Sequence, residues 1–269
     1  MTDDILTRST AAKSDNARAV YPSLRDRHVL ITGGGTGIGE EVVAAFAAQG
    51  ARVSFVDIAE QPSRALVERL APISRHIPMF LPCNLCDLAA LEIAIEAIEA
   101  GNGPIEILIN NAANDDRHAV DAVTPAYWDN RMAVNLRHLF FASQAAARSM
   151  RKAGRGAIVN FSSISWHLAL PELVLYETAK AGIEGMTRGL ARDLGVYGIR
   201  VNAVIPGAVR TARQDRLWHN PAEIQRTLDQ QCLKERVMPA DVAALVLFLA
   251  SDDARMCTAH SYFVDAGLA

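Results

Sequence analysis

The sequence predicts a single α/β domain, built on a doubly wound parallel sheet of about seven strands with helices on both faces. Three observations predict this fold. Short runs rich in β-forming residues alternate with helical patterns, a glycine-rich turn follows the first run, and no internal repeat or linker interrupts the alternation. The chain has 269 residues, which is long enough for one such domain to bury a large core.

The expected strands come first. They are residues 28–32 (HVLIT), 52–57 (RVSFVD), 79–83 (MFLPC), 105–111 (IEILINN), 157–163 (AIVNFSS), 200–206 (RVNAVIP) and 262–265 (YFVD). Helical patterns separate them, as the crossovers between parallel strands require. We expect residues 24–269 to form the domain. Residues 1–23 are polar and aperiodic, so we expect them to be a mobile or loosely docked tail.

Two long helical patterns lie in the second half of the chain. Residues 124–150 open with Thr124 as the expected N-cap and a proline at the first helical position, and the stretch after it is compatible with helix throughout. Residues 176–195 carry apolar side chains at helical spacing, and Gly195 is placed to end that helix.

Composition excludes several classes of protein. With 50% hydrophobic residues, 21% charged residues and a net charge of −3, the chain is typical of soluble globular proteins and lacks the basic surplus of a nucleic-acid binder. The longest apolar run, residues 242–250, is too short to cross a membrane, and the first twenty residues contain no secretory signal. The four cysteines lack the paired spacing of a metal site, so we expect reduced thiols, no metal and a cytoplasmic location.

A glycine-rich turn lies between the first expected strand and the next helix. In TGGGTGIGEE (32–41), Gly33, Gly37 and Gly39 leave the backbone bare, which would let a pyrophosphate approach the N–H groups of the helix N-terminus. The spacing, G-x-x-x-G-x-G, differs from the general dinucleotide fingerprint. On its own this turn could equally be an ordinary connection from strand to helix.

Asp57, at the end of the second expected strand, supports a dinucleotide site. It follows Gly39 by about the twenty residues expected for an acid that binds the adenosine ribose. Its charge would repel a 2′-phosphate, and Thr36 stands where a basic residue could have bound one. NAD is therefore the favoured cofactor and NADP the less favoured one. A solvated acid at the strand end is the alternative explanation of Asp57.

The stretch YETAK places a phenol, Tyr176, and an ammonium, Lys180, on one face of a helix. A free tyrosine titrates near pH ~10, so its pKa must fall to about 7, by roughly 4 kcal/mol, for it to act as a base near neutral pH. We predict that Lys180 and a cationic nicotinamide stabilise the phenolate in a site screened from water. Ser163 ends the fifth expected strand and is placed to hydrogen-bond the substrate oxygen.

Together these motifs have the order and spacing of a known family. TGGGTGIG, NNAA (110–113), Asn135, Ser163, Tyr176-x-x-x-Lys180 and PGAVRT (206–211) resemble the short-chain dehydrogenase/reductase family over essentially residues 24–269. The resemblance implies a Rossmann-type fold, a nicotinamide cofactor, and Asn135, Ser163, Tyr176 and Lys180 as the catalytic group. It also implies that Lys180 holds the nicotinamide ribose and that Asn135 anchors a water on the proton path to solvent.

The same resemblance implies further contacts to the cofactor. Asn84 stands where many members have an aspartate that binds the adenine amine, Ala113 replaces a usual glycine, and Thr211 resembles the residue that bonds the nicotinamide carboxamide. The full expected cofactor set is Gly33, Thr36, Gly37, Ile38, Gly39, Asp57, Asn84, Leu85, Asn111, Ala112, Ala113, Tyr176, Lys180, Pro206, Gly207, Val209 and Thr211.

Polar loops follow the fourth and fifth expected strands, at the edge where open α/β sheets bind ligands. Residues 114–118 (NDDRH) and 163–170 (SISWHLAL) offer many hydrogen bonds and one flat apolar ring, which suit a small polyhydroxylated ring better than a steroid or an acyl chain. A solvated loop and a packed lid, respectively, are the alternatives. The expected substrate contacts are Asn114, Ser163, Ser165, Trp166, His167 and Tyr176.

Longer segments, among them NDDRH, SISWHL and LYETAKAGIEGMTR, resemble the bacterial aldose 1-dehydrogenases of this family. This resemblance implies an oxidoreductase that transfers a hydride from the anomeric C1 hydroxyl of a pentose or galactose-like sugar to NAD, with Tyr176 as the base, to give an aldonolactone. It does not fix the epimer. The alternatives are a family member acting on a polyol, a 3-oxoacyl group or a steroid, and a non-catalytic nucleotide-binding protein.

The resemblance to the short-chain dehydrogenase/reductase family also implies a homotetramer, with a dimer as the alternative. Two features of the sequence favour self-association. One side of the Tyr176 helix carries Gly182, Gly185 and Gly189, which would let a neighbour approach closely, and the C-terminal strand is nonpolar.

Overall fold

Seven parallel strands form one sheet, which confirms the predicted fold class. The computed structural model describes residues 19–218 and 220–269, and residues 1–18 of the predicted tail lie outside the described residues. The spatial order of the strands is β3-β2-β1-β4-β5-β6-β7, and all neighbours run parallel. The strands are β1 His28–Thr32, β2 Arg52–Asp57, β3 Met79–Pro82, β4 Ile107–Asn110, β5 Gly156–Phe161, β6 Ile199–Pro206 and β7 Ser261–Val264.

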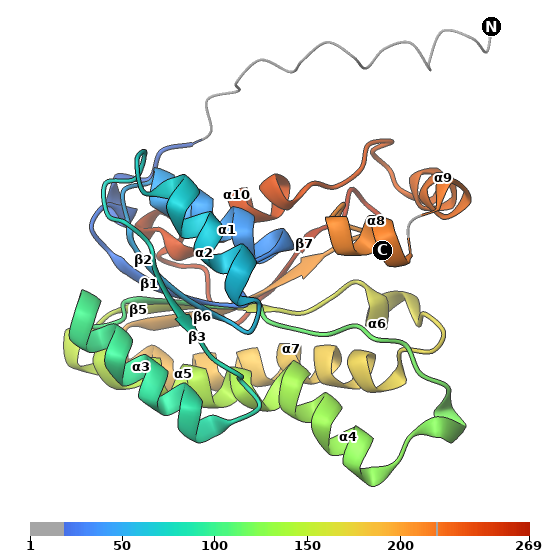
Figure 1. The fold of residues 1–269 in the computed structure, drawn as a ribbon, viewed down its shortest axis with the longest axis horizontal. Helices are drawn as coiled ribbons and strands as arrows, with labels where there is room; N and C mark the ends of the chain where they lie inside the picture. Colours follow the sequence, from blue (N-terminus) through green and yellow to red (C-terminus); the bar gives the residue numbers. More distant parts are fainter. Residues whose placement is uncertain (1–18, 219) are drawn as a thin grey trace, which may run out of the picture.

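Helices cover both faces of the sheet, and each face buries its own apolar core (Figure 1). Helices α1, α2 and α10 pack on one face, and α3, α5 and α7 pack on the other. The helices are α1 Gly37–Ala48, α2 Glu60–Leu70, α3 Leu88–Asn102, α4 Pro125–Met132, α5 His138–Ala153, α6 Ser165–Leu168, α7 Val174–Leu194, α8 Ala212–Leu217, α9 Pro221–Gln230 and α10 Pro239–Ala250. Because both faces are covered, the strands read as nearly continuous apolar runs.

The direction in which successive strands are added to the sheet reverses at β1. The chain builds outward from β1 to β2 and β3, and then returns to the other side of β1 with β4. The carboxyl ends of β1 and β4 therefore lie side by side at the switch point, where open α/β sheets bind ligands. Strand β5 ends at Phe161, two residues before the predicted end, so Ser162 and Ser163 lie outside the strand at this same edge.

The predicted helix over residues 124–150 is wrong in one respect. Thr124 is its N-cap, as predicted, and accepts a hydrogen bond from the Tyr127 N–H at 3.2 Å. A wider π-helical turn, Ala133–Arg137, then separates α4 from α5. This turn contains Asn135, whose side chain is bonded to backbone outside the helix. The predicted C-terminus of α7 at Gly195 is confirmed.

The described part of the predicted tail contacts the domain. The Tyr21 N–H donates to Gln49 Oε1 at 2.8 Å, and Leu24, in the 3₁₀ turn Pro22–Leu24, is buried in the core. None of the helices among the described residues is long and apolar enough to cross a membrane. The four cysteines are free thiols.

Candidate active site

The glycine turn after β1 is packed too tightly for larger residues. Gly33 has a φ of +68°, and a Cβ built on it would lie 2.7 Å from Ala112 Cα. A Cβ on Gly39 would lie 1.8 Å from the Gly33 carbonyl oxygen. Gly37, the first residue of α1, has a φ of +61°. The glycines between β1 and α1 therefore leave this backbone uncovered by side chains. The turn lies against the segment that follows β4.

The N-terminus of α1 fits a phosphate group. Thr36 occupies the N-cap position and is exposed, and its side chain makes no capping hydrogen bond with the described residues. The N–H groups of the first turn have no intrahelical partner, so an anion can accept hydrogen bonds from them. Ile38 is half-buried and packs against the core beneath this turn.

Asp57 lies at the end of β2, beside the glycine turn. Its Oδ2 accepts from the Gly35 N–H at 2.8 Å, and its Oδ1 accepts from the Ala59 N–H at 2.9 Å. Each carboxylate oxygen has a second lone pair, so the side chain is fixed in place and can still accept from a ribose hydroxyl. The geometry suits the predicted role of Asp57.

The segment after β3 contributes two expected residues. Asn84 is exposed, and its Oδ1 accepts from the Cys86 N–H at 3.1 Å. The oxygen that would accept a hydrogen bond from the adenine amine therefore already accepts one from the backbone. Leu85 is buried beneath it.

Polar side chains tie the carboxyl end of β4 to its neighbours. Asn110 is buried and donates to Asn160 Oδ1 at 2.9 Å, and Asn111 Nδ2 donates to the Gly33 carbonyl at 2.8 Å. These bonds hold the segment against the glycine turn. Ala112 lies within van der Waals distance of Gly33, and Ala113 next to it is exposed.

The side chain of Asn135 fixes the chain at Asn114. Its Oδ1 accepts from the Asn114 N–H at 2.8 Å, and its Nδ2 donates to the Asn114 carbonyl at 3.0 Å. Asn135 is fully buried, so both ends of its amide are satisfied by backbone. In this structure the residue positions the start of the polar loop that was predicted to contact substrate.

Ser163, Tyr176 and Lys180 lie together below the switch point. Lys180 Nζ lies 5.3 Å from the centroid of the Tyr176 ring and donates to the Phe161 carbonyl at 2.7 Å. The Ser163 side chain hydrogen-bonds to Tyr176 and also accepts from the Ser165 hydroxyl at 3.0 Å. Lys180 is buried, and Tyr176 is half-buried. Tyr176 thus lies next to both of the side chains predicted to act with it.

Burial dominates the electrostatics of this pair. Burial raises the pKa of Tyr176 well above its usual range, and the charge of Asp115 raises it further, while a hydrogen bond from Ser163 and the charge of Arg213 lower it. Burial lowers the pKa of Lys180 to about 7, and Asp115 raises it. These shifts belong to the cofactor-free protein, so the prediction that Lys180 and a cationic nicotinamide together stabilise the phenolate stays a prediction.

The lowered pKa of Lys180 predicts a pH-dependent stability. An unfolded lysine keeps its proton to about pH 10.4, whereas native Lys180 loses it near pH 7, so between these values the unfolded chain binds more protons. The free energy of unfolding of the cofactor-free protein should then rise with pH by up to about 1.4 kcal/mol per unit from about pH 7 to about 10. Urea unfolding should show this rise in the wild type and in exposed Lys152→Met, but not in Lys180→Met. An equal slope in Lys180→Met would contradict it.

The segment after β6 lies next to the start of α1. Pro206 ends β6, and a Cβ on Gly207 would lie 2.6 Å from Asp265 Cα. Val209 is buried, and Thr211 caps α8 by accepting from the Gln214 N–H at 3.2 Å. The methyl group of Thr211 lies near Gly37, so this segment reaches the start of α1.

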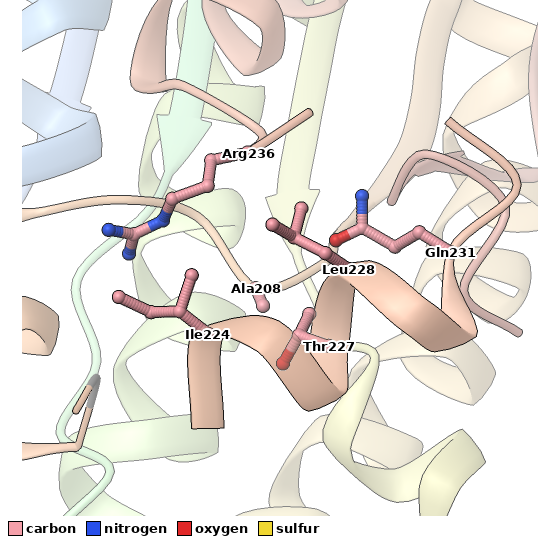
Figure 2. A pocket seen from close by; sticks show the side chains of 6 residues that line it. All are labelled: Ala208, Ile224, Thr227, Leu228, Gln231 and Arg236. Atoms are coloured by element: carbon pink, nitrogen blue, oxygen red, sulfur yellow. The ribbon is translucent and has the colours of Figure 1, made fainter. Parts of the chain in front are cut away.

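Helix α9 packs on this same segment (Figure 2). Ile224, Thr227 and Leu228 of α9 face Ala208 across a small hollow, which Gln231 and Arg236 also line. The hollow has room for about one water molecule, since its volume is only ≈ 10 Å³. It is a packing contact between α9 and the segment that follows β6.

A polar cluster that sequence reasoning missed joins the loop after β4 to α8. Arg213 Nη2 of α8 contacts Asp115 at 3.0 Å and Asp116 at 2.7 Å, and Gln214 Nε2 donates to Asp115 at 2.7 Å. The two segments are about a hundred residues apart in sequence, so spacing gave no signal of their pairing. Asp115 was recognised only as a polar residue of the loop, and Arg213 and Gln214 were not predicted.

The expected substrate contacts divide into two groups. Ser163 hydrogen-bonds to Tyr176, Ser165 is buried next to Ser163, and Asn114 is held by Asn135 after β4. Trp166 and His167 instead direct their ring nitrogens at Glu184 of α7, at 2.7 and 3.3 Å. Their rings stack on each other, with centroids 3.8 Å apart. This geometry favours the packed lid over direct contact with a sugar.

Comparison with known proteins identifies similar chains over most of this length. A family profile described as "Enoyl-(Acyl carrier protein) reductase" matches residues 33–269. D-xylose 1-dehydrogenase of Caulobacter vibrioides is 56% identical over 251 residues, which cover 93% of this chain and 98% of that one. A Rhizobium meliloti protein named "Probable galactose dehydrogenase GalD" is 49% identical, covering 92% and 97%.

Solved structures agree with the fold. A gluconate 5-dehydrogenase from Burkholderia cenocepacia, solved in complex with NADP and tartrate, superimposes with a TM-score of 0.85 at 30% identity and covers 92% of this chain and 97% of its own. A short-chain type dehydrogenase/reductase from Mycobacterium ulcerans gives a TM-score of 0.87 at 26% identity, covering 91% and 90%.

Proposed function

Because this chain belongs to the short-chain dehydrogenase/reductase family, we propose that it oxidises the anomeric carbon of an aldose to an aldonolactone with NAD. The observation that carries the proposal is the contact between Ser163, Tyr176 and Lys180 beside the bare glycine turn. The identity of 56% with a D-xylose 1-dehydrogenase supports an aldose as the substrate.

The residues present fit a nicotinamide dinucleotide. The pyrophosphate would lie on Gly33, Gly37 and Gly39, and Asp57 would bind the adenosine ribose. When bound, the oxidised nicotinamide supplies the hydride acceptor and a positive charge beside Tyr176. That charge, together with the ammonium of Lys180, would lower the phenol pKa, which burial raises.

The side chains then have defined tasks. Ser163 donates a hydrogen bond to the C1 oxygen of the sugar, and Tyr176 accepts the C1 hydroxyl proton as the C1–H bond breaks and the C1–O bond becomes a carbonyl. Lys180, as an ammonium, stabilises the phenolate, and we keep its proposed contact to the nicotinamide ribose. Asn135 fixes Asn114 at the rim, and its role on a proton path to solvent stays a prediction.

The rim of the site suits a polyhydroxylated ring. Asn114 and Asp115 follow β4, Arg213 and Gln214 lie on α8, and Asp115 accepts hydrogen bonds from both α8 side chains. These donors and acceptors can exchange bonds with one another for bonds to the hydroxyls of a sugar, whereas a steroid or acyl chain offers them few polar partners. We propose an aldose pyranose as the substrate class.

The test of this function is a panel of substrates. Wild-type protein should reduce NAD in the presence of D-xylose, L-arabinose or D-galactose, and it should be inactive with polyols, steroid alcohols and 3-hydroxyacyl thioesters. NADH formation is followed by absorbance, and the sugar product is identified as a lactone. Turnover of only the non-sugar alcohols would refute the aldose assignment.

Asp57 should set the preference between NAD and NADP. Asp57→Asn removes the charge that repels a 2′-phosphate and weakens a charged hydrogen bond worth about 1.5–3 kcal/mol. We expect kcat/KM for NAD to fall about 10- to 100-fold, while kcat/KM for NADP rises. Glu60→Gln, an exposed carboxylate three residues away, is the matched control. An unchanged ratio of NAD to NADP use would count against Asp57 as the ribose ligand.

Self-association remains a proposal. Trp128 of α4 and Phe140 and Phe141 of α5 are 37–43% exposed, and such apolar exposure is typical of an interface. Gly185 and Gly189 of α7 have nothing within 4 Å of a built Cβ. We propose a homotetramer, and we keep the predicted cytoplasmic location on the evidence of the reduced cysteines.

A further inference from the structure

The carboxylate of Glu184 lies within hydrogen-bond distance of four side chains near the proposed catalytic residues. Its Oε1 lies 2.9 Å from the Ser162 hydroxyl, 2.7 Å from Trp166 Nε1 and 3.3 Å from His167 Nε2, and its Oε2 accepts from the Ser261 hydroxyl at 2.9 Å. The side chain is only 17% exposed. A buried carboxylate with this many donors is held rigidly, because its lone pairs are largely satisfied.

The partners of Glu184 come from separate elements. Ser162 follows β5, Trp166 and His167 form α6, and Ser261 begins β7, while Glu184 itself lies on α7. Tyr176, Lys180 and Glu184 are spaced four residues apart on that helix and therefore share one face. The carboxylate thus joins the face that carries the reacting phenol to the two segments that flank Ser163.

Backbone strain in the neighbouring segment shows why such an anchor is needed. Ala169 and Glu172 have φ values of +51° and +63°, in the left-handed region that non-glycine residues rarely adopt. Such residues persist only where the surroundings hold them. Two carboxylates of α7 do so: Glu177 accepts from the Leu170 N–H at 2.7 Å, and Glu184 holds α6 immediately before the strained residues.

We propose that Glu184 is a positioning residue that sets the geometry between Ser163 and Tyr176. Ser163 is fixed on one side by Ser162, which bonds Glu184, and on the other by Ser165, which precedes Trp166. Tyr176 is fixed by α7. If the carboxylate is removed, α6 is free to move relative to α7, and the hydroxyl of Ser163 leaves the position in which it binds the substrate oxygen beside the phenol.

This inference rests on the proposed function, because it concerns the alignment of the proposed catalytic groups. A displacement of about 1 Å at a reacting group costs about 100-fold in rate. Loss of alignment should lower kcat far more than it weakens cofactor binding, since the glycine turn and Asp57 lie at the ends of β1 and β2, whereas Glu184 holds the segments that follow β5. It should also make the hydride step rate-limiting.

The test compares three substitutions at Glu184. Glu184→Ala should lower kcat about 100-fold, and Glu184→Asp, which keeps the charge but shortens the side chain, should lower it about 10-fold. Glu184→Gln keeps an acceptor for Trp166 and should recover most of the activity. The primary isotope effect from C1-deuterated aldose should increase in the Ala and Asp variants, and the Kd for NADH should stay within about 2-fold of wild type. Asp193→Asn, exposed on the same helix, should match wild type.

Several outcomes would overturn the proposal. Wild-type kcat and isotope effect in Glu184→Ala would do so, as would a loss confined to KM or to NADH affinity. If Glu184→Ala does not fold, Glu184→Asp decides, and an unchanged isotope effect in that variant contradicts the proposal. If wild type oxidises no aldose but does oxidise another alcohol, the proposed function fails. The kcat ratios and isotope effects of the Glu184 variants, measured with that alcohol, still test the positioning role of Glu184.

Discussion

Replacing Tyr176 with Phe should abolish sugar oxidation while leaving NADH binding nearly intact. The substitution removes one oxygen, which is the atom that accepts the C1 hydroxyl proton, and keeps the ring that packs over Lys180. General base catalysis contributes about 10²- to 10⁴-fold, so we expect kcat to fall by about that factor. NADH binding is measured by fluorescence titration, and turnover by NADH absorbance.

Tyr197→Phe is the matched control, because Tyr197 is exposed in the 3₁₀ turn that follows α7 and its ring stacks on Arg151. It should keep wild-type kcat. Activity retained in Tyr176→Phe would show that another group takes the proton. A parallel loss of NADH binding would instead show that the phenol serves the cofactor site rather than the chemistry.

Gly39→Ala should destroy the cofactor site. A Cβ at this position would lie 1.8 Å from the Gly33 carbonyl oxygen and 2.7 Å from Asn111 Nδ2, so the glycine turn and the end of β4 would have to separate. Overpacking of this kind costs about 1–3 kcal/mol in the free energy of unfolding, and the displaced backbone can no longer approach a pyrophosphate. We expect no measurable NADH binding and a lower urea midpoint.

The control for this substitution is Gly195→Ala, at the C-cap of α7. Nothing lies within 4 Å of a Cβ built there, and Gly195 has helical φ and ψ angles of −59° and −33°, which alanine adopts without strain. This variant should be at least as stable as wild type and should bind NADH normally. NADH affinity in Gly39→Ala equal to that of Gly195→Ala would contradict the tight contact between Gly39 and Gly33.

Local signals were sufficient to predict the fold and most of the geometry around the cofactor. The boundaries of β1 and β2 were predicted to the residue, because both strands are apolar runs that end at polar turns. The π-helical turn at Ala133–Arg137 was not predicted. Every residue in that stretch is compatible with an ordinary helix, and the turn carries Asn135, whose bonds to the Asn114 backbone are a tertiary contact that sequence spacing does not reveal.

The electrostatics could not be predicted for a related reason. Sequence places Lys180 next to Tyr176, but the sign of the pKa change depends on how much water each group loses, and burial dominates for both. The salt bridge between Arg213 and Asp115 and the carboxylate of Glu184 were missed because their partners are distant in sequence. Trp166 and His167 were correctly placed near the fifth strand, but their contact with Glu184 was not foreseen.

The fate of a deuterium at C1 tests the central claim most directly. Wild-type protein is incubated with NAD and an aldose deuterated at C1, and the label is followed by mass spectrometry in the nicotinamide and sugar products. We predict deuterated NADH and an unlabelled aldonolactone in equal amounts, and neither product with Tyr176→Phe. Unlabelled NADH, or an oxidised sugar that retains the deuterium at C1, would contradict oxidation at the anomeric carbon.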